Sequence, residues 1–489
     1  MVPLYVQKLY SRTLKGNGFI RSVLVLSGGT IFGQILLLMA SVVLTRLYSP
    51  SDFGVLTAFS ALLAFGTVLT TLRYDIAIPL PDEHSDAMSL LGLCLVIITT
   101  VCLLVGIGVL FFRYEVASLL NVPKLESLLW LLPVGLAGIG TYNSFYYLRV
   151  RQKDYPRIAR TRIVQSVSQL VVQIGSGLLS PSAWGLVFGQ IAGQVGGIGS
   201  LSKGILKPGQ GFWTAQRPPN LISVGRRYKR FPLYLLPASL LNAASLQLPT
   251  LLLTALFGTV VAGWYGLSYR VLMTPMTLVG QAIATVFFAE SSAVTKSTDV
   301  RRYATKTFSG LVVVGMGPLL LLGLVAPSLF ELLFGSQWRM AGVYAQWLVP
   351  WLFLVLIASP LSSLVFVMER QRGELIFQSS LLVTRIAAFY GGYFLFGVAT
   401  AAMALYGISG SVIWLVYVLW LMSIAGISVR ATLDILVREL FVSMIFVTPA
   451  AVVSLLIKNE IYGVLAAGVC GVGLVIRILF RVRELKQKP

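Results

Sequence analysis

A stripe of polar side chains runs along one predicted membrane-spanning helix, which covers residues 261–289. Its members are Arg270, Thr274, Thr277, Gln281 and Thr285, at spacings of four, three, four and four residues. These spacings place all five side chains on one face of an α-helix. An arginine at the centre of a span costs roughly 2.5–3.5 kcal/mol on insertion scales, so it normally faces a cavity or a partner. A face of this kind is suited to hold an anion such as phosphate by charge-assisted hydrogen bonds.

We expect Gln165, Gln169, Gln173, Gln34 and Asn242 to line the same cavity. Three other predicted spans carry these and further polar side chains. They are Gln165, Gln169, Gln173 and Ser176 in residues 161–180, Gln34, Ser41 and Thr45 in residues 22–47, and Asn242 and Ser245 in residues 231–257. A second intramembrane arginine, Arg385, is the second candidate for the substrate site; the alternative is a structural pairing, because its span has no aligned polar stripe. The alternative is that these groups only hydrogen-bond one helix to another, usually for less than about 1 kcal/mol each. Both interpretations are open for residues 161–180, whereas we favour a water-filled cavity beside Arg270.

The composition identifies an all-α polytopic membrane protein. Hydrophobic residues make up 57% of the chain, charged residues make up 11%, and the mean hydropathy is +0.85. A span needs about 20 mostly apolar residues. About fourteen transmembrane helices are predicted, at residues 22–47, 52–72, 87–111, 127–148, 161–180, 183–202, 231–257, 261–289, 307–330, 343–367, 375–396, 400–423, 440–457 and 460–480. Helix counting is least certain over 161–202 and 440–480.

The net charge of +21 is distributed unevenly across these spans. With the N-terminus inside, thirty-one of the 38 Lys and Arg fall on the inner side and five on the outer side. The remaining two are Arg270 and Arg385. Such asymmetry predicts cytoplasmic N- and C-termini and contacts with anionic lipid heads. It also argues against nucleic acid as a partner.

One short motif occurs twice in the chain. Leu44-Thr45-Arg46-Leu47-Tyr48 with Gly54 recurs as Leu253-Thr254-Ala255-Leu256-Phe257 with Gly263, an offset of 209 residues, and Arg151-Gln152-Lys153 recurs as Arg370-Gln371-Arg372, an offset of 219. Six predicted helices separate the two copies, so the repeats are parallel and relate by an axis along the membrane normal. We expect two six-helix lobes around a central cavity plus a C-terminal helix pair. The predicted parts are a basic N-terminal segment (1–21), an N-lobe (22–202), a cytoplasmic linker (203–230), a C-lobe (231–423) and the helix pair with its basic tail (424–489).

The sequence offers no constellation typical of an enzyme or a metal site. Cys94, Cys102 and Cys470 all fall inside spans, where core packing is the default. The only histidine, His84, sits in a solvated acidic loop, which is too poor in convergent ligands for a metal. No nucleophile–base pairing or Walker loop is present, so active transport would use an ion gradient. Acidic residues deep in the spans are absent, since Asp75 and Glu290 lie near helix ends.

Two segments resemble a known family. The runs Leu44 to Gly54 (LTRLYSPSDFG) and Leu72 to Pro81 (LRYDIAIPLP) resemble the opening of Wzx-type polysaccharide or O-antigen flippases. These flippases belong to the multidrug/oligosaccharidyl-lipid/polysaccharide (MOP) exporter superfamily. In the second half, Leu333 to Trp338 (LFGSQW) with Ala341 resembles that family's FG-x-x-W…A segment. The resemblance implies a bacterial inner-membrane flippase that moves undecaprenyl-diphosphate-linked oligosaccharide from the inner to the outer leaflet by alternating access. It also implies ion-coupled antiport in some members.

These observations lead to one preferred function and two alternatives. The preferred substrate is a lipid-linked oligosaccharide for surface polysaccharide, including lipopolysaccharide, whose diphosphate meets Arg270 and whose sugars meet the polar stripes. Polysaccharide polymerase or glycosyltransferases are the partners expected with it. No cofactor is expected, and a coupling ion, Na⁺ or H⁺, is not identified by the sequence. The alternatives are an ion-coupled exporter of amphiphilic small molecules and a non-transporting membrane scaffold. Neighbouring genes for glycosyltransferases would favour the first function.

The charge asymmetry predicts the sidedness of two loops. In a chain without its native cysteines, a cysteine placed at Ser182 should react with a membrane-impermeant thiol reagent from outside the cell. A cysteine at Gln216 should react only after the membrane is opened. The reverse pattern would overturn the predicted topology.

Overall fold

The computed structural model describes residues 17–205, 218–291, 297–362, 364–365, 368, 370–457 and 460–487. Within these residues the side chains of 17–27, 277–291 and 297–300, among a few others, are not described. The described residues contain helices and no strand. The chain forms two compact units, Met1–Thr259 and Val260–Pro489, called here the N-terminal and C-terminal units.

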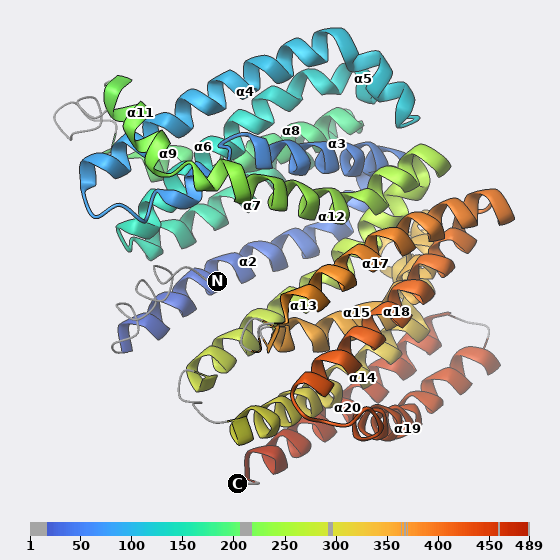
Figure 1. The fold of residues 1–489 in the computed structure, drawn as a ribbon. Helices are drawn as coiled ribbons and strands as arrows, with labels where there is room; N and C mark the ends of the chain where they lie inside the picture. The colour runs from blue at the N-terminus through green and yellow to red at the C-terminus, as the bar shows by residue number, and fades with distance from the viewer. Residues whose placement is uncertain are drawn as a thin grey trace. The chain divides into compact units, whose positions relative to one another are not determined.

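The N-terminal unit is a bundle of long helices joined by short turns (Figure 1). Its elements are α2 (Asn17–Leu47), α3 (Pro50–Leu69), the 3₁₀ turn η1 (Tyr74–Ala77), α4 (His84–Leu119), α5 (Leu125–Leu128), η2 (Leu129–Leu131), α6 (Leu132–Arg151), α7 (Tyr155–Leu179), α8 (Ala183–Val195), α9 (Ile198–Ser202), α11 (Pro218–Arg227), the π-helical turn η3 (Phe231–Leu235) and α12 (Leu236–Phe257). Helix α13 (Thr259–Ser291) begins at the last residue of this unit.

The C-terminal unit contains the rest of α13 and the helices that follow it. These are α14 (Ser297–Phe334), η4 (Ser336–Trp338), α15 (Arg339–Leu361), α17 (Gln371–Gly391), the π-helical turn η5 (Gly392–Phe396), α18 (Ala399–Ile424), α19 (Val429–Leu456) and α20 (Glu460–Gln487). Helix α15 packs between α14 and α18, and the last two helices pack against α14. Leu321 and Val325 of α14 share a buried cluster with Ala450 of α19 and Leu474 of α20. The expected C-terminal helix pair is therefore part of this unit's core.

Each of the fourteen predicted spans coincides with a helix, so the predicted fold class is confirmed. Eleven helices in the described part are long and apolar enough to cross a membrane. The other three predicted spans fall on α7, α8 and α13. Helix α7 is rich in Gln and Arg, and α8 has only 13 residues. The end of α13 lies among residues whose side chains are not described.

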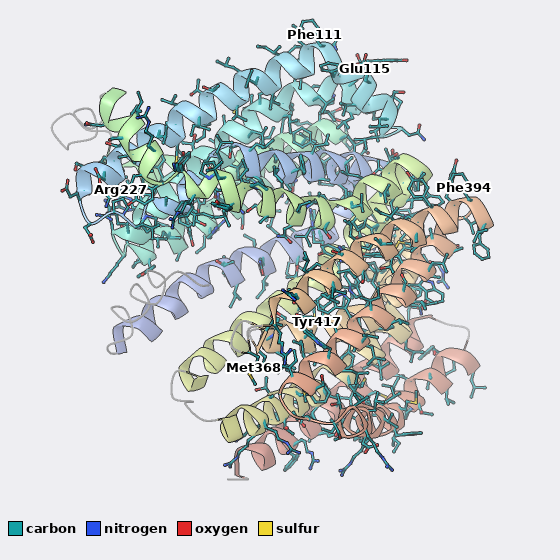
Figure 2. All side chains as sticks on the ribbon, in the orientation of Figure 1. Phe111, Glu115, Arg227, Met368, Phe394 and Tyr417 are labelled. Atoms are coloured by element: carbon teal, nitrogen blue, oxygen red, sulfur yellow. The ribbon has the colours of Figure 1, made fainter. Side chains whose placement is uncertain are left out.

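The outward faces of both units are apolar, as lipid contact requires. Phe111 on α4 is 67% exposed and Phe394 in η5 is 74% exposed. Figure 2 shows both side chains pointing away from their helices. In a soluble protein such patches would mark an interface, but here they lie on spanning helices and fit the hydrocarbon core.

The first family-like segment builds the turn between α2 and α3. Ser49 caps α3: its hydroxyl accepts from the backbone N–H of Asp52, while the Asp52 carboxylate accepts from the backbone N–H of Ser49, forming a capping box with Pro50 in the first turn. Tyr48 is buried, and its hydroxyl donates to the carbonyl of Gln173 at 2.6 Å. The motif therefore fixes a helix start and anchors it to α7.

The second copy of this motif lies at the corresponding turn. Helix α12 ends at Phe257 and α13 begins at Thr259, which is 209 residues after the start of α3 at Pro50. The two turns meet: the hydroxyls of Ser51 and Thr259 lie 2.9 Å apart. Gly54 abuts the Thr259 backbone so closely that a Cβ at Gly54 would overlap the Thr259 carbonyl group. Superposition of residues 22–202 on 231–423 stays a prediction.

Helix α12 belongs to the N-terminal unit by its contacts, because it packs along α3. The C-lobe predicted from the sequence begins at residue 231, before this helix, whereas the structural boundary follows Thr259. Sequence offsets identify equivalent helices in a repeat, but they carry no information about which unit a helix contacts.

The second family-like segment, LFGSQW, turns the chain between α14 and α15. Gly335 has a φ of 105°, a conformation that disfavours residues with a side chain. Trp338 and Ala341 are fully buried. The indole N–H of Trp264 donates to the Gln337 carbonyl at 2.9 Å, and the Ser268 hydroxyl donates to the Ala341 carbonyl at 2.5 Å. The segment thus fastens α13 to the α14–α15 turn.

The Gly54 contact generates a test of this packing. Gly54→Ala should push α3 away from the backbone of Thr259 and destabilise the protein by about 1–3 kcal/mol, as overpacked cores do. Thermal unfolding of the purified protein in detergent would report this as a lower midpoint. Gly108→Ala on α4 is the matched control, because a methyl group there would meet no neighbouring atom within 4 Å. Equal midpoints for the two variants would contradict the close contact at Gly54.

Candidate functional site

Helix α7 is held between two glycine-bearing helix faces. Gly29 and Gly33 of α2 are four residues apart, and Gly33 lies so close to α7 that a Cβ there would be 2.6 Å from the Ser166 hydroxyl. On the other side, α8 presents glycines at the same four-residue interval, at Gly185, Gly189 and Gly193. Small residues at this spacing let membrane helices approach closely. The glycine spacing is visible in the sequence and is a signal for the site that the polar stripes alone did not supply.

The polar stripe on α7 divides into a covered half and an open half. Gln173 is fully buried, and its amide donates to the Leu186 carbonyl of α8 at 2.9 Å. Ser176 lies 3.0 Å from the Tyr48 hydroxyl. A Cβ at Gly189 would collide with the Gln173 side chain, which leaves that side chain no access to a substrate. This half of the stripe joins helices, as the alternative interpretation predicted for residues 161–180.

The open half lines a pocket of about 200 Å³ between α2, α7 and α8. Gln165 and Gln169 are partly exposed there. The complete lining is Thr30, Gly33, Gln34 and Leu37 of α2, Arg162, Gln165, Ser166 and Gln169 of α7, and Gly193 and Gln194 of α8. Three predicted site residues, Gln34, Gln165 and Gln169, are thus brought together by packing. Amides and hydroxyls of this kind can donate to and accept from sugar hydroxyls.

Arg162 supplies the positive charge of this pocket. Its guanidinium carbon lies 5.3 Å from the ring centre of Tyr142 and 5.6 Å from that of Tyr146, both on α6. One of its N–H groups donates to the Gln165 side-chain oxygen at 3.3 Å. No carboxylate lies within 4.0 Å of it among the described side chains. Cation–π contact orients the guanidinium without neutralising it, so its charge is available to an anion.

The stripe on α13 is described only in its first part. Arg270 is partly exposed, and no ion pair involves it among the residues with described side chains. The Thr274 hydroxyl donates to the Arg270 carbonyl at 2.8 Å. Pro275 follows inside the helix, where a proline removes one backbone donor and favours a bend. Thr277, Gln281 and Thr285 lie outside the described side chains, so the cavity-lining role of this stripe stays a prediction.

The other two predicted site residues have contrasting surroundings. Arg385 on α17 is buried, and its guanidinium carbon lies 5.9 Å from the ring centre of Trp351. It also interacts electrostatically with Tyr269 and Tyr406, which places it in an aromatic cluster of the C-terminal unit. Asn242 is exposed on α12. Arg385 thus has structural partners, as its lack of an aligned stripe suggested.

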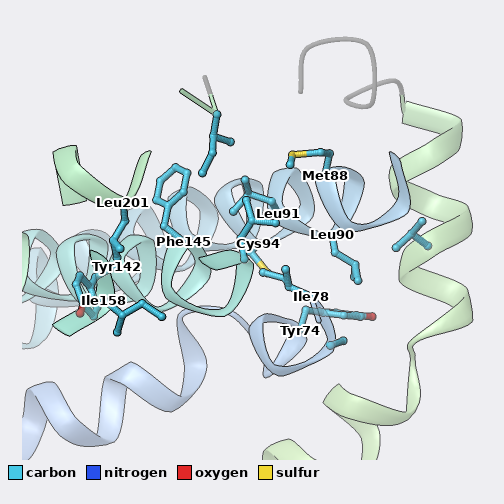
Figure 3. Close-up of a cluster of buried hydrophobic side chains, with 14 residues drawn as sticks. Tyr74, Ile78, Met88, Leu90, Leu91, Cys94, Tyr142, Phe145, Ile158 and Leu201 are labelled. Atoms are coloured by element: carbon cyan, nitrogen blue, oxygen red, sulfur yellow. The ribbon is translucent and has the colours of Figure 1, made fainter. Parts of the chain in front are cut away.

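The burial of the Asp75 carboxylate was not predicted from the sequence. Asp75 does lie near a helix end, in η1, but it is only 3% exposed. It adjoins a hydrophobic cluster formed by η1, α4 and α6, in which Tyr74, Ile78 and Cys94 take part (Figure 3). Burial raises the pKa of Asp75 above its ordinary value, although the Thr71 hydroxyl and Arg73 oppose this shift. Position near a helix end does not disclose burial, because loops fold back onto the bundle.

Comparison with known proteins agrees with this architecture. The family described as polysaccharide biosynthesis protein matches residues 43–342. The chain is 24% identical over 353 residues to the Escherichia coli K12 lipopolysaccharide biosynthesis protein WzxC, covering 71% of this chain and 69% of WzxC. It is 21% identical over 336 residues to an uncharacterized membrane protein in the cps region of Klebsiella pneumoniae, covering 66% of each. The chain thus spans about two thirds of the length of these relatives.

Solved structures with a similar fold include two transport proteins. The lipid II flippase MurJ in an inward closed conformation has a TM-score of 0.72 at 13% identity, covering 95% of this chain and 100% of that one. An inward-facing multidrug resistance MATE family transporter of the MOP superfamily has a TM-score of 0.57 at 14% identity, covering 86% and 98%. The resemblance seen in the sequence is confirmed, and the chain is a membrane protein rather than an enzyme. The chain belongs to the polysaccharide biosynthesis protein family.

Proposed function

We propose that this protein flips undecaprenyl-diphosphate-linked oligosaccharide units from the inner to the outer leaflet of the bacterial inner membrane. The units then serve surface polysaccharide biosynthesis, and transport proceeds by alternating access between two lobes. The observation that carries the proposal is the pocket beside Arg162, which gathers amides, hydroxyls and a cation inside an apolar bundle. Family membership and the similarity to WzxC support a polysaccharide substrate, and the MurJ fold supports flipping of a lipid-linked one.

The chemistry of the substrate matches the groups available. A diphosphate needs charge-assisted donors, and a planar guanidinium can donate two parallel hydrogen bonds to it. We assign that role to Arg270. The sugar hydroxyls meet Gln34, Gln165 and Gln169, whose side chains can donate and accept. The polyprenyl tail stays in the bilayer throughout, because moving it out of lipid would cost about 0.8 kcal/mol per CH₂.

The proposal also implies how the protein is oriented in the membrane and which enzymes act before and after it. Both termini lie in the cytoplasm, where the basic clusters contact anionic lipid heads. Glycosyltransferases that complete the lipid-linked unit act before the flippase, and the polysaccharide polymerase acts after it. The two steps on either side of the membrane require a carrier between them.

The proposed phosphate clamp predicts a graded loss on substitution of Arg270. Arg270→Ala removes a charge-assisted pair, worth roughly 1.5–3 kcal/mol, and should lower substrate affinity about ten- to a hundredfold. Arg270→Lys should recover part of the loss, because lysine keeps the charge but not the planar fork. The measurement is surface polysaccharide produced by cells with matched amounts of each variant in the membrane. Normal polymer from Arg270→Ala would remove Arg270 from the mechanism.

The two halves of the α7 stripe predict opposite consequences for neighbouring glutamines. Gln169→Ala should reduce polysaccharide production while leaving the thermal unfolding midpoint unchanged, because this side chain lines the pocket. Gln173→Ala should lower the midpoint, since it removes the buried hydrogen bond to the Leu186 carbonyl, typically worth about 0.5–1.5 kcal/mol. Both quantities can be measured for both variants. If Gln169→Ala instead lowered the unfolding midpoint and left transport normal at matched abundance, the pocket would not contact substrate.

A further inference from the structure

Asp75 is a buried carboxylate without a direct ion pair among the described side chains. The Thr71 hydroxyl donates to its carboxylate at 2.8 Å. Within the part of the chain whose side chains are described, no Lys, Arg or His nitrogen lies within 4.0 Å of it. The comparable buried carboxylate, Glu439 on α19, is paired directly with Arg477 of α20. A buried acid without such a partner is costly to keep ionised, so it tends to hold a proton instead.

Several titratable groups surround this carboxylate. Arg73 lies on the same loop, and Cys94 of α4 and Tyr147 of α6 interact electrostatically with Asp75. Of these, only Arg73 carries a charge near neutral pH. The loop itself is held in place by Arg151, whose guanidinium donates to the carbonyls of Pro79, Pro81 and Asp82. Asp75 therefore sits in a fixed environment, with one cation near enough to respond to its charge.

Arg73 connects the Asp75 loop to another helix. Its Nε donates to the Ser239 hydroxyl of α12 at 2.9 Å, and Ser239 is itself buried. Leu72 and Arg73 both adopt positive φ angles, 47° and 66°. Two consecutive residues with side chains in this region are strained, and such strain persists only where the surroundings enforce it. The strained turn directs Arg73 toward α12, the helix that leads into the Arg270 helix.

We propose that Asp75 is a proton-binding site whose charge controls the hydrogen bond between Arg73 and α12. When Asp75 is ionised, its negative charge holds Arg73 in position beside Ser239. When a proton from water binds a carboxylate oxygen, that attraction ends and the link to α12 weakens. The role of this switch in coupling transport to protons rests on the proposed flippase function.

The ligand chemistry favours a proton over a sodium ion. Sodium needs several converging oxygen ligands, whereas the described side chains place one carboxylate and one hydroxyl here. Groups of three or more His, Cys, Asp or Glu that could hold a metal ion are absent from the described residues. Protonation needs only one carboxylate oxygen and exchange with water at the loop.

Proton binding at Asp75 has a defined effect on stability. Because burial raises the pKa of Asp75, the folded protein keeps this proton at pH values where the unfolded chain has lost it. This contribution to stability is complete below the ordinary range of aspartate and is lost as the pH rises through the raised pKa. Asp75→Asn, which imitates the protonated acid in size, should abolish this part of the pH dependence.

The first experiment measures thermal unfolding of the purified full chain from acidic to neutral pH. As the pH rises, the unfolding midpoint of the wild type should fall further than that of Asp75→Asn. The control Asp82→Asn, at an exposed carboxylate on the same loop, should follow the wild type. Identical pH dependence of the wild type and Asp75→Asn would overturn the proposal.

Infrared spectroscopy of the wild type provides a readout that needs no Asp75 variant. A protonated carboxylic acid has its own C=O absorption, and this band should disappear as the pH rises. Arg73→Gln should move that transition to higher pH, because Arg73 favours the ionised form. The proposal would also be overturned if the wild type had no carboxylic acid band, or if Arg73→Gln did not shift its transition.

The second experiment tests the link to α12 without substrate. An environment-sensitive dye on a cysteine at Leu241, an exposed position of α12, should change its fluorescence as Asp75 titrates. Asp75→Asn and Ser239→Ala should each remove that change, and Asp82→Asn should retain it. A response that persists in Ser239→Ala would refute the link. Because none of these three experiments uses a lipid-linked sugar, failure here is distinguishable from failure of the proposed function.

Discussion

Polar groups inside this helical bundle need partners within the protein, because the hydrocarbon core of a bilayer offers no water to satisfy them. The close approach of α2 and α8 to α7 follows from that constraint. Glycines on both neighbours bring backbone carbonyls within reach of the α7 side chains, and Gln173 donates to one of them. Where the covering is incomplete, beside Gln165 and Gln169, a polar pocket opens. The packing of α2 and α8 against α7 therefore produces both the helix contacts and the pocket.

Arg385, Arg162 and Arg270 illustrate how surroundings decide a role. Arg385 is buried beside Trp351, so its charge is engaged in a packed aromatic cluster. Arg162 also lies over aromatic rings, but it borders a pocket and keeps donors available. Arg270 is partly exposed on a helix that contains Pro275 five residues later. Arg385 is thus suited to a structural role, whereas Arg162 and Arg270 are suited to binding an anion.

The family-like segments have physical reasons for their residue types. Ser49 and Asp52 cap a helix start, Gly54 admits the Thr259 backbone, and Gly335 takes a backbone conformation that a side chain would hinder. Neither LTRLYSPSDFG nor LFGSQW lines the described pocket. Their resemblance to relatives therefore reports shared turns and helix contacts. Specificity for a particular substrate depends on other residues, such as those of α7.

Sequence alone determined the helices of this protein, because spanning a bilayer demands long apolar runs that are visible in one dimension. All fourteen predicted spans coincide with helices, including those of α7 and α8, which lie in one of the two regions where the sequence left the helix count open. Tertiary structure alone decided which polar residues are accessible. Gln169 and Gln173 are equivalent by helical spacing, yet only one faces a pocket, since glycines of α8 cover the other. Likewise Asp75 lies outside every apolar run, and only the folding of its loop onto α4 and α6 buries it.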